Sequence, residues 1–207
     1  MKFKLLAIAL LISSFCTAQK EQFKFDFTPG KAPKGYIKIN SSDRYTAQKG
    51  YGYDLQPASA GENKPFYFSV LVPDGNYKVT VKIGSKDKSG ITTVRGESRR
   101  LFIENLATKK GEIVEVTFII NKRNTKISEN EYVNIKAREK KKLNWDDKLT
   151  LEFNGDDALI ETITIEKVNN VPTIFLFGDS TVVDQDNEPW ASWGQMITRF
   201  FDDHVCF

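Results

Sequence analysis

The chain has 207 residues, 40% of them hydrophobic and 12% aromatic, which is enough for a sizeable core in one large or two small domains. Its 30 basic and 27 acidic residues give a formal net charge of +3, too small an excess to indicate a nucleic-acid-binding protein. Beyond the amino terminus no segment is apolar enough to cross a bilayer, so we expect no permanent membrane span.

Residues 1–18 have the pattern of a signal peptide. Lys2 and Lys4 precede an apolar run over 5–12, and Thr17 and Ala18 supply small residues for cleavage before Gln19. Cleavage lowers the basic count from 30 to 28, against 27 acidic residues. The alternative is a lipoprotein with a lipid on Cys16, which the bulky neighbour Phe15 disfavours. We therefore expect a secreted or periplasmic protein.

Residues 19–168 are predicted to form an antiparallel β-sandwich or jelly roll, because apolar and polar residues alternate there with a period of two. Pro73-Asp74-Gly75-Asn76 lies between two such runs and is predicted to be a hairpin turn. The alternating positions are Phe23, Phe25 and Phe27; Phe66, Phe68 and Val70; Tyr77, Val79, Val81 and Ile83; Val114, Val116, Phe118 and Ile120; Leu149, Leu151 and Phe153; and Ile163 and Ile165.

The opening Phe25-Asp26-Phe27-x-x-Gly30, with Tyr51-Gly52-Tyr53-Asp54 downstream, resembles the galactose-binding-like sandwich that precedes the catalytic domain of some bacterial pectin esterases. This resemblance suggests Tyr51, Tyr53 and Trp145 as sugar contacts, although a place in the core or at an edge of the sandwich is the favoured interpretation. A basic cluster follows, which is interpreted as a solvated hairpin rather than a site for an acidic polymer. It comprises Lys136, Arg138, Lys140, Lys141 and Lys142.

Residues 169–207 do not continue the alternating pattern of residues 19–168. Asn169, Asn170 and Pro172 form a short seam after the last alternating run. Thr173–Phe177 is then almost wholly apolar, which predicts a strand buried on both faces of a parallel sheet. It ends at Gly178-Asp179-Ser180-Thr181, a turn that would expose Ser180 at the carboxyl end of the strand, where ligands bind in open α/β folds.

This block resembles the first signature block of the SGNH (GDSL) hydrolases, and Trp190-Ala191-Ser192-Trp193-Gly194 points to their rhamnogalacturonan acetylesterase branch. The resemblance implies the first βα unit of a flavodoxin-like α/β domain. It also implies that Ser180 is the nucleophile and that its backbone N–H is one oxyanion-hole donor. Gly178 permits the tight backbone, and Asp179 supports the turn through short-range hydrogen bonds. No metal or organic cofactor is implied.

A helix is expected to begin near Pro189, with an apolar stripe formed by Trp190, Trp193, Ile197 and Phe200–Phe201. We interpret both tryptophans as core residues packed against the sheet. Asp184, Asp186 and Asn187 are interpreted as a solvated loop, because the rest of a calcium-loop ligand set is missing.

The family pattern continues with a glycine block, an asparagine block and a late Asp-x-x-His, and these 207 residues contain none of them. The single histidine, His204, lies too soon after Ser180 to match the family's base and is assigned no catalytic role. We therefore expect the chain to stop inside its catalytic domain and to show little or no turnover by itself.

The leading hypothesis is a secreted serine esterase that removes acetyl groups from acetylated plant cell-wall polysaccharide, namely pectin. Two alternatives remain open: a non-catalytic carbohydrate-binding sandwich, and an SGNH lipase or esterase that acts on other esters.

Overall fold

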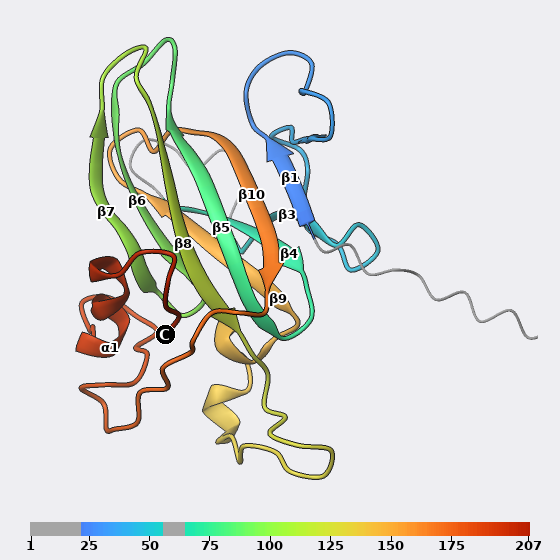
Figure 1. The fold of residues 1–207 in the computed structure, drawn as a ribbon, viewed down its shortest axis with the longest axis vertical. Coiled ribbons are helices and arrows are strands. Elements are labelled where there is room, and N and C mark those ends of the chain that lie inside the picture. Colours follow the sequence, from blue (N-terminus) through green and yellow to red (C-terminus); the bar gives the residue numbers. More distant parts are fainter. Residues whose placement is uncertain (1–21, 56–64) are drawn as a thin grey trace, which may run out of the picture.

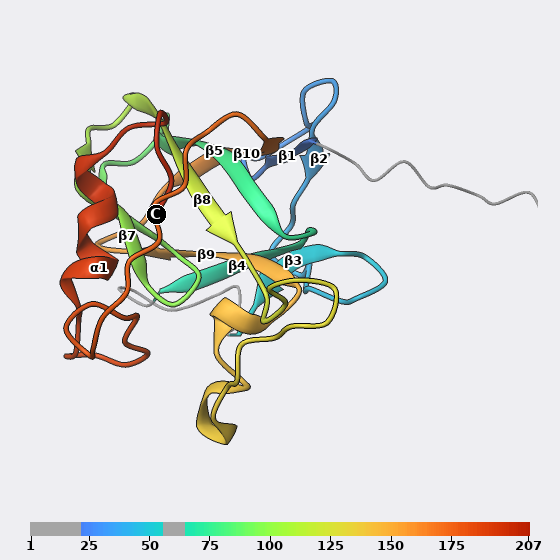
Figure 2. The same cartoon turned by 60° about the horizontal axis from the view of Figure 1, so that its bottom comes forward.

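The computed structural model describes residues 22–55 and 65–207, which form two five-stranded sheets packed face to face (Figures 1 and 2). The predicted signal peptide, with its cleavage site at Ala18, lies outside these residues. One sheet has the strand order β2-β1-β10-β5-β8 and the other β3-β4-β9-β6-β7. Strand pairing is antiparallel except between β1 and β2. The mainly β prediction and the sandwich are confirmed.

The strands of the first sheet are β1 (Gln22–Asp26), β2 (Ile37–Lys38), β5 (Gly75–Gly84), β8 (Ile113–Lys122) and β10 (Ile160–Val168). Those of the second are β3 (Tyr51–Asp54), β4 (Phe66–Leu71), β6 (Gly90–Gly96), β7 (Arg100–Thr108) and β9 (Lys148–Asn154). Two 3₁₀ turns, η1 (Ala137–Glu139) and η2 (Leu143–Trp145), lie between β8 and β9, where the basic cluster was expected to form a hairpin. The short helix α1 (Trp193–Met196) and the 3₁₀ turn η3 (Ile197–Phe200) follow β10.

The core lies between the two sheets and contains the residues picked out by the alternation. Phe25 and Phe68 are fully buried, with ring centroids 4.9 Å apart in an edge-to-face arrangement. Val79, Val81 and Ile163 are also fully buried. Alternation predicts these positions because successive residues of a strand point to opposite faces of its sheet.

The turn at 73–76 is not a hairpin, so that prediction is wrong. β4 pairs with β3 and β9, whereas β5 pairs with β8 and β10 in the other sheet. Residues 72–74 therefore carry the chain from one sheet to the other. The Tyr77 hydroxyl donates to the Pro73 carbonyl at 2.8 Å and closes this connection. The turn residues mark a change of direction, but they carry no information about which strands pair.

The segment after β10 does not form the predicted βα unit. Its pairing is a single parallel bridge between Thr173 and Cys206, and Phe175 and Phe177 are 59% and 90% exposed. A buried parallel strand needs neighbours on its edges and layers on both faces, and the described residues supply one bridge partner. The prediction of a buried strand at 173–177 is therefore wrong for this structure.

α1 begins at Trp193, with Ser192 as its N-cap, rather than near Pro189. The Gln195 N–H donates to Ser192 Oγ at 3.1 Å, and the Ser192 N–H donates to Gln195 Oε1 at 3.0 Å, which is a capping box. Trp190 and Trp193 are 69% and 50% exposed, so the prediction that they are core residues is wrong. The buried face of α1 and η3 is polar instead, with Gln195 and Thr198 packed toward β7. Both views show this short helical stretch beside β7 (Figures 1 and 2).

Within residues 22–55 and 65–207, no helix has the length and apolar character needed to span a membrane.

Candidate active site

Ser180 lies on an exposed turn that short-range hydrogen bonds fix. One oxygen of the Asp179 carboxylate, Oδ1, accepts from the Thr181 N–H at 2.9 Å and from the Thr181 hydroxyl at 2.8 Å. The hydrogen bond from the Thr181 N–H lowers the pKa of Asp179. The Asp179 carbonyl also accepts from the Val182 and Val183 N–H groups at 3.0 and 3.1 Å. Asp179 therefore bonds across Ser180 to residues 181–183, and Ser180 itself is exposed.

Two glycines allow the turn to pack tightly around Val182. A Cβ at Gly178 would lie 2.4 Å from Val182 Cγ2, and a Cβ at Gly194 would lie 2.1 Å from the Val182 carbonyl oxygen. The same carbonyl accepts from the Ser192 hydroxyl at 2.9 Å. The Ser180 turn and the start of α1 are thus in direct contact. A side chain at Gly194 would separate them, and a side chain at Gly178 would clash with Val182 inside the turn.

Gln185 holds the backbone of Ser180 from the other side. Its side-chain Nε2 donates to the Ser180 carbonyl at 2.8 Å and to the Val183 carbonyl at 3.3 Å. Gln185 in turn is held through its own carbonyl, which accepts from Gln195 Nε2 at 2.9 Å and from Arg99 Nη1 at 3.3 Å. These two donors connect the site to the sandwich.

The sandwich contacts the site through the turn between β6 and β7. Glu97 and Arg99 in this turn have φ of 54° and 66°, in the left-handed region that few non-glycine residues adopt. Arg99 donates to the Trp190 carbonyl at 2.9 Å and forms an ion pair with Glu188 at 2.7 Å. Arg95, on β6, pairs with the same Glu188 oxygen at 3.0 Å. The sequence gives no signal for this arrangement, since neither positive φ nor the partners are visible in it.

Glu97 is buried beneath this contact, at 2% exposure. Its Oε1 accepts from the Thr150 N–H at 2.9 Å, and its own N–H donates to the Thr150 carbonyl at 2.8 Å, which ties the turn to β9. Burial raises the pKa of Glu97 to about 8, although the neighbouring Arg100 opposes this. Near neutral pH the side chain is therefore mainly protonated.

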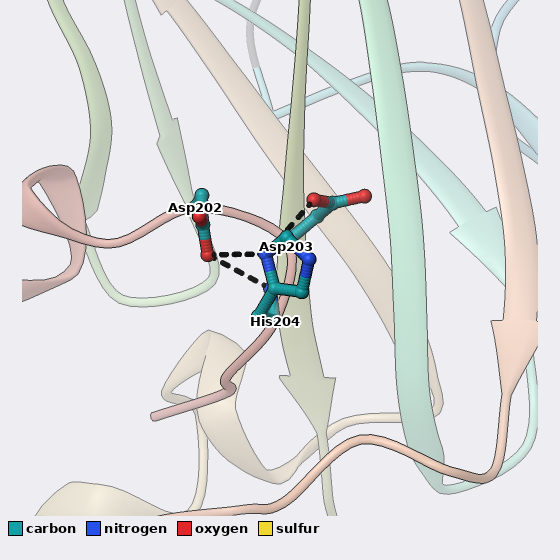
Figure 3. A group of neighbouring side chains, drawn as sticks. All are labelled: Asp202, Asp203 and His204. Carbon is teal, nitrogen blue, oxygen red and sulfur yellow. Dashed lines mark hydrogen bonds and ion pairs between the residues drawn. The ribbon is translucent and has the colours of Figure 1, made fainter.

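His204 lies in the group Asp202, Asp203 and His204, which is the candidate metal-binding group among the described residues (Figure 3). Its Nδ1 is 2.8 Å from Asp202 Oδ1 and 3.7 Å from Asp203 Oδ1, and its side chain is 82% exposed. The hydrogen bond to Asp202 raises the pKa of His204. Asp203 also pairs with Lys78 on β5 at 2.7 Å. Ion pairing among these side chains accounts for the cluster, and the bonds of His204 lead to Asp202 and Asp203 rather than to Ser180.

The three aromatic residues predicted as sugar contacts do not form an open platform. Tyr51 and Tyr53 pack against the core, with centroid distances of 5.2 Å from Tyr51 to Phe25 and 5.9 Å from Tyr53 to Phe68. Trp145 is half-buried, and the Arg123 guanidinium lies 5.9 Å from the centre of its ring. Each of the three rings is thus half-buried and has neighbours from the chain itself.

A surface cavity of about 540 Å³ lies where the β5–β6, β7–β8 and β9–β10 connections meet. Ser89, Thr108, Asp156 and Asp157 contribute to its lining, which includes neither Ser180 nor the three aromatic residues. The predicted nucleophile and the predicted sugar contacts are therefore not gathered around this cavity.

No family model matches the chain. Its sequence is 26% identical over 220 aligned residues to the uncharacterized esterase YxiM of Bacillus subtilis strain 168, covering 94% of this chain and 51% of that protein. The chain is thus a distant relative of a protein named as an esterase, and it spans about half of that relative's length.

Two solved structures are similar in part. The crystal structure of YxiM from Bacillus subtilis matches with a TM-score of 0.47 and 25% identity, over 90% of this chain and 53% of that one. A ruminal GH26 endo-β-1,4-mannanase matches with a TM-score of 0.30 and 14% identity, over 88% and 32%. Both TM-scores are low, and the relation in sequence is the one that bears on function.

We predict that replacing Glu97 changes how stability depends on pH. Between the ordinary carboxyl pKa of about 4.3 and the folded-state value, the folded protein keeps a proton that the unfolded chain releases. The free energy of unfolding should therefore fall as the pH rises toward about 8. Glu97→Gln mimics the protonated form and does not titrate. Its free energy of unfolding relative to the wild type should therefore be higher at about pH 8 than at about pH 5, by on the order of a few kcal/mol.

Urea unfolding at both pH values measures this gain. Glu129→Gln is the matched control, because Glu129 is exposed. Equal pH dependence in the two variants would contradict the prediction.

A second prediction concerns the pKa of His204, the one histidine of the chain. Asp202→Asn removes the hydrogen-bonded carboxylate and should lower the pKa of His204 toward its ordinary value of about 6.5. Asp203→Asn should lower it less, since that carboxylate is the more distant one. NMR titration of the chain's one histidine gives both shifts, and an unchanged pKa in Asp202→Asn would show that the pair does not form in solution.

Proposed function

We propose that the chain belongs to a serine esterase in which Ser180 is the nucleophile and its backbone N–H is an oxyanion-hole donor. The observation that carries this proposal is the exposed Ser180 on a turn fixed by Asp179 and packed without space for a side chain at Gly178. A pre-formed turn of this kind exposes a hydroxyl and orients a backbone donor. The distant relation to an esterase supports the same reaction class.

The reaction would be acyl transfer. Ser180 Oγ attacks the ester carbonyl carbon, its proton passes to a base, and the alcohol leaves with a proton; water then releases the acid from the acyl-enzyme. The described residues hold no imidazole hydrogen-bonded to Ser180, since His204 bonds to its own neighbours Asp202 and Asp203. Nucleophilic attack by Ser180 therefore requires a base beyond these contacts, and the chain alone is expected to turn over little or no substrate.

As substrate we propose acetyl groups on pectic polysaccharide, and as location the exterior of the cell or the periplasm. The substrate proposal is supported by the resemblance of Gly178–Thr181 and Trp190–Gly194 to the rhamnogalacturonan acetylesterase branch. The location is supported by the signal-peptide pattern of residues 1–18.

The nucleophile is tested by supplying the missing base. With p-nitrophenyl acetate and free imidazole, Ser180 should be acetylated about ten-fold faster than the exposed serines Ser41 and Ser128, because the proposal places an oxyanion-hole donor, the Ser180 backbone N–H, beside its hydroxyl. Peptide mass spectrometry over time gives the rate at each serine. Ser180→Ala should remove the fast site and leave the slow ones unchanged. Acetylation at equal rates on all three serines would rule Ser180 out as an activated nucleophile.

The substrate proposal predicts selectivity in the same assay. Acetylated pectin should compete and slow the labelling of Ser180 by p-nitrophenyl acetate, whereas the same pectin after saponification should not. A long-chain p-nitrophenyl ester should label Ser180 more slowly than the acetyl ester. Faster labelling by the long-chain ester, with no competition by pectin, would favour the lipase-like alternative.

A further inference from the structure

We propose that Arg99 and Gln195 are positioning residues for Ser180, so that the sandwich forms a structural part of the active site. This inference rests on the proposed role of Ser180. Both side chains bind the carbonyl of Gln185, and the side chain of Gln185 binds the carbonyl of Ser180. Two successive hydrogen bonds thus connect Arg99, in the β6–β7 turn, to Ser180: one from Arg99 to Gln185 and one from Gln185 to Ser180.

Gln195 is the buried centre of this path. Its side chain has 0% exposure, and Nε2 uses both of its protons, one on the Ser98 carbonyl at 2.7 Å and one on the Gln185 carbonyl at 2.9 Å. Its Oε1 accepts from the Ser192 N–H. A buried amide with each of these groups bonded has one favoured orientation, because any rotation would leave a buried polar group without a partner. It therefore fixes Gln185 relative to β6 and β7.

Arg99 supplies the second hold. Its Nη1 donates to the Gln185 and Trp190 carbonyls at 3.3 and 2.9 Å, while Nη2 pairs with Glu188. The guanidinium thus bonds the 185–190 loop at three residues. A planar group with several fixed donors restricts a loop more than one flexible contact does.

The docking of residues 171–207 on the sandwich does not depend on Arg99. Lys78 pairs with Asp203, Arg100 donates to the Phe207 carbonyl at 3.0 Å, and Asn76 donates to the Thr173 hydroxyl at 2.7 Å. The Thr198 hydroxyl bonds to the Leu101 carbonyl, and Arg199 pairs with Glu104. Loss of Arg99 should therefore leave the segment docked while releasing the loop that holds Ser180.

Arg199 provides a matched control. Arg99 and Arg199 each form an arginine–carboxylate pair between the sandwich and this segment, but the pair of Arg199 with Glu104 is not connected to Gln185 or Ser180. A purely structural role predicts similar effects for Arg99→Ala and Arg199→Ala. A positioning role predicts that only Arg99→Ala affects the Ser180 turn.

Two readouts on the purified chain test this inference. Hydrogen exchange should be about ten-fold faster at the Val182 and Val183 amides in Arg99→Ala and unchanged in Arg199→Ala, since these amides close the Ser180 turn. Imidazole-assisted acetylation of Ser180 should fall by about ten-fold or more in Arg99→Ala and by less than about two-fold in Arg199→Ala. Gln185→Leu, which removes the side-chain donor, should reproduce both effects of Arg99→Ala.

The outcomes separate the two proposals. Unchanged exchange in both Arg99→Ala and Gln185→Leu overturns the positioning role, as does accelerated exchange with an unchanged rate of Ser180 acetylation. Equal effects of Arg99→Ala and Arg199→Ala on exchange also overturn it. If the wild-type chain shows no preferential acetylation of Ser180, the proposed nucleophile fails, and the exchange data alone then decide whether the sandwich holds this turn.

Discussion

The side-chain amide of Gln195 is the interaction on which the arrangement of the candidate site depends. It is fully buried and joins the β6–β7 turn, the first turn of α1 and the loop that holds Ser180. A buried amide costs free energy unless its polar atoms are bonded, so the three elements are held in one relative position. The sandwich therefore does more than precede the site in the chain. The β6–β7 turn of the sandwich has an uncommon backbone conformation at Glu97 and Arg99. Through Arg99 this turn bonds directly to the loop that holds Ser180.

Polar contacts, more than apolar burial, hold residues 171–207 on the sandwich. Phe177, Trp190 and Phe200 are 90%, 69% and 70% exposed, while the buried side chains of α1 and η3 are the polar Gln195 and Thr198. Hydrogen bonds and ion pairs are directional, so they fix orientation better than apolar contact does, but each contributes little net stability. A segment bound in this way keeps a defined geometry while its aromatic side chains stay in solvent.

The sequence predicts the sandwich well and the segment after it poorly, for a physical reason. Burial on one face of a strand leaves a local signal, the alternation of Tyr77, Val79 and Val81, which can be read without knowing the partner strand. Strand partners leave no such signal, which is why the sequence predicts a hairpin at 73–76 although the chain crosses there between sheets. The helical spacing of the tryptophans predicts a buried apolar face, but the face that is buried there is polar. Ser180, Gly178 and Asp179 could be singled out from their motif, but Arg99, Gln185 and Gln195 could not, since their roles arise from contacts across about a hundred residues of chain.

The electrostatics of the two titratable groups discussed above bear on where a base for Ser180 has to come from. A serine hydroxyl attacks an ester only when a nearby group takes its proton, and that group must be unprotonated at the working pH. Glu97 is mainly protonated near neutral pH, and its carboxyl group bonds to Thr150 beneath the turn. The pKa of His204 is raised by Asp202, which favours its protonated form, and its bonds lead to residues 202 and 203. In the proposed reaction Ser180 supplies the hydroxyl and a backbone donor, whereas the bonds of Glu97 and His204 lead to other residues. Proton transfer is therefore the step of that reaction that these two groups leave to another base.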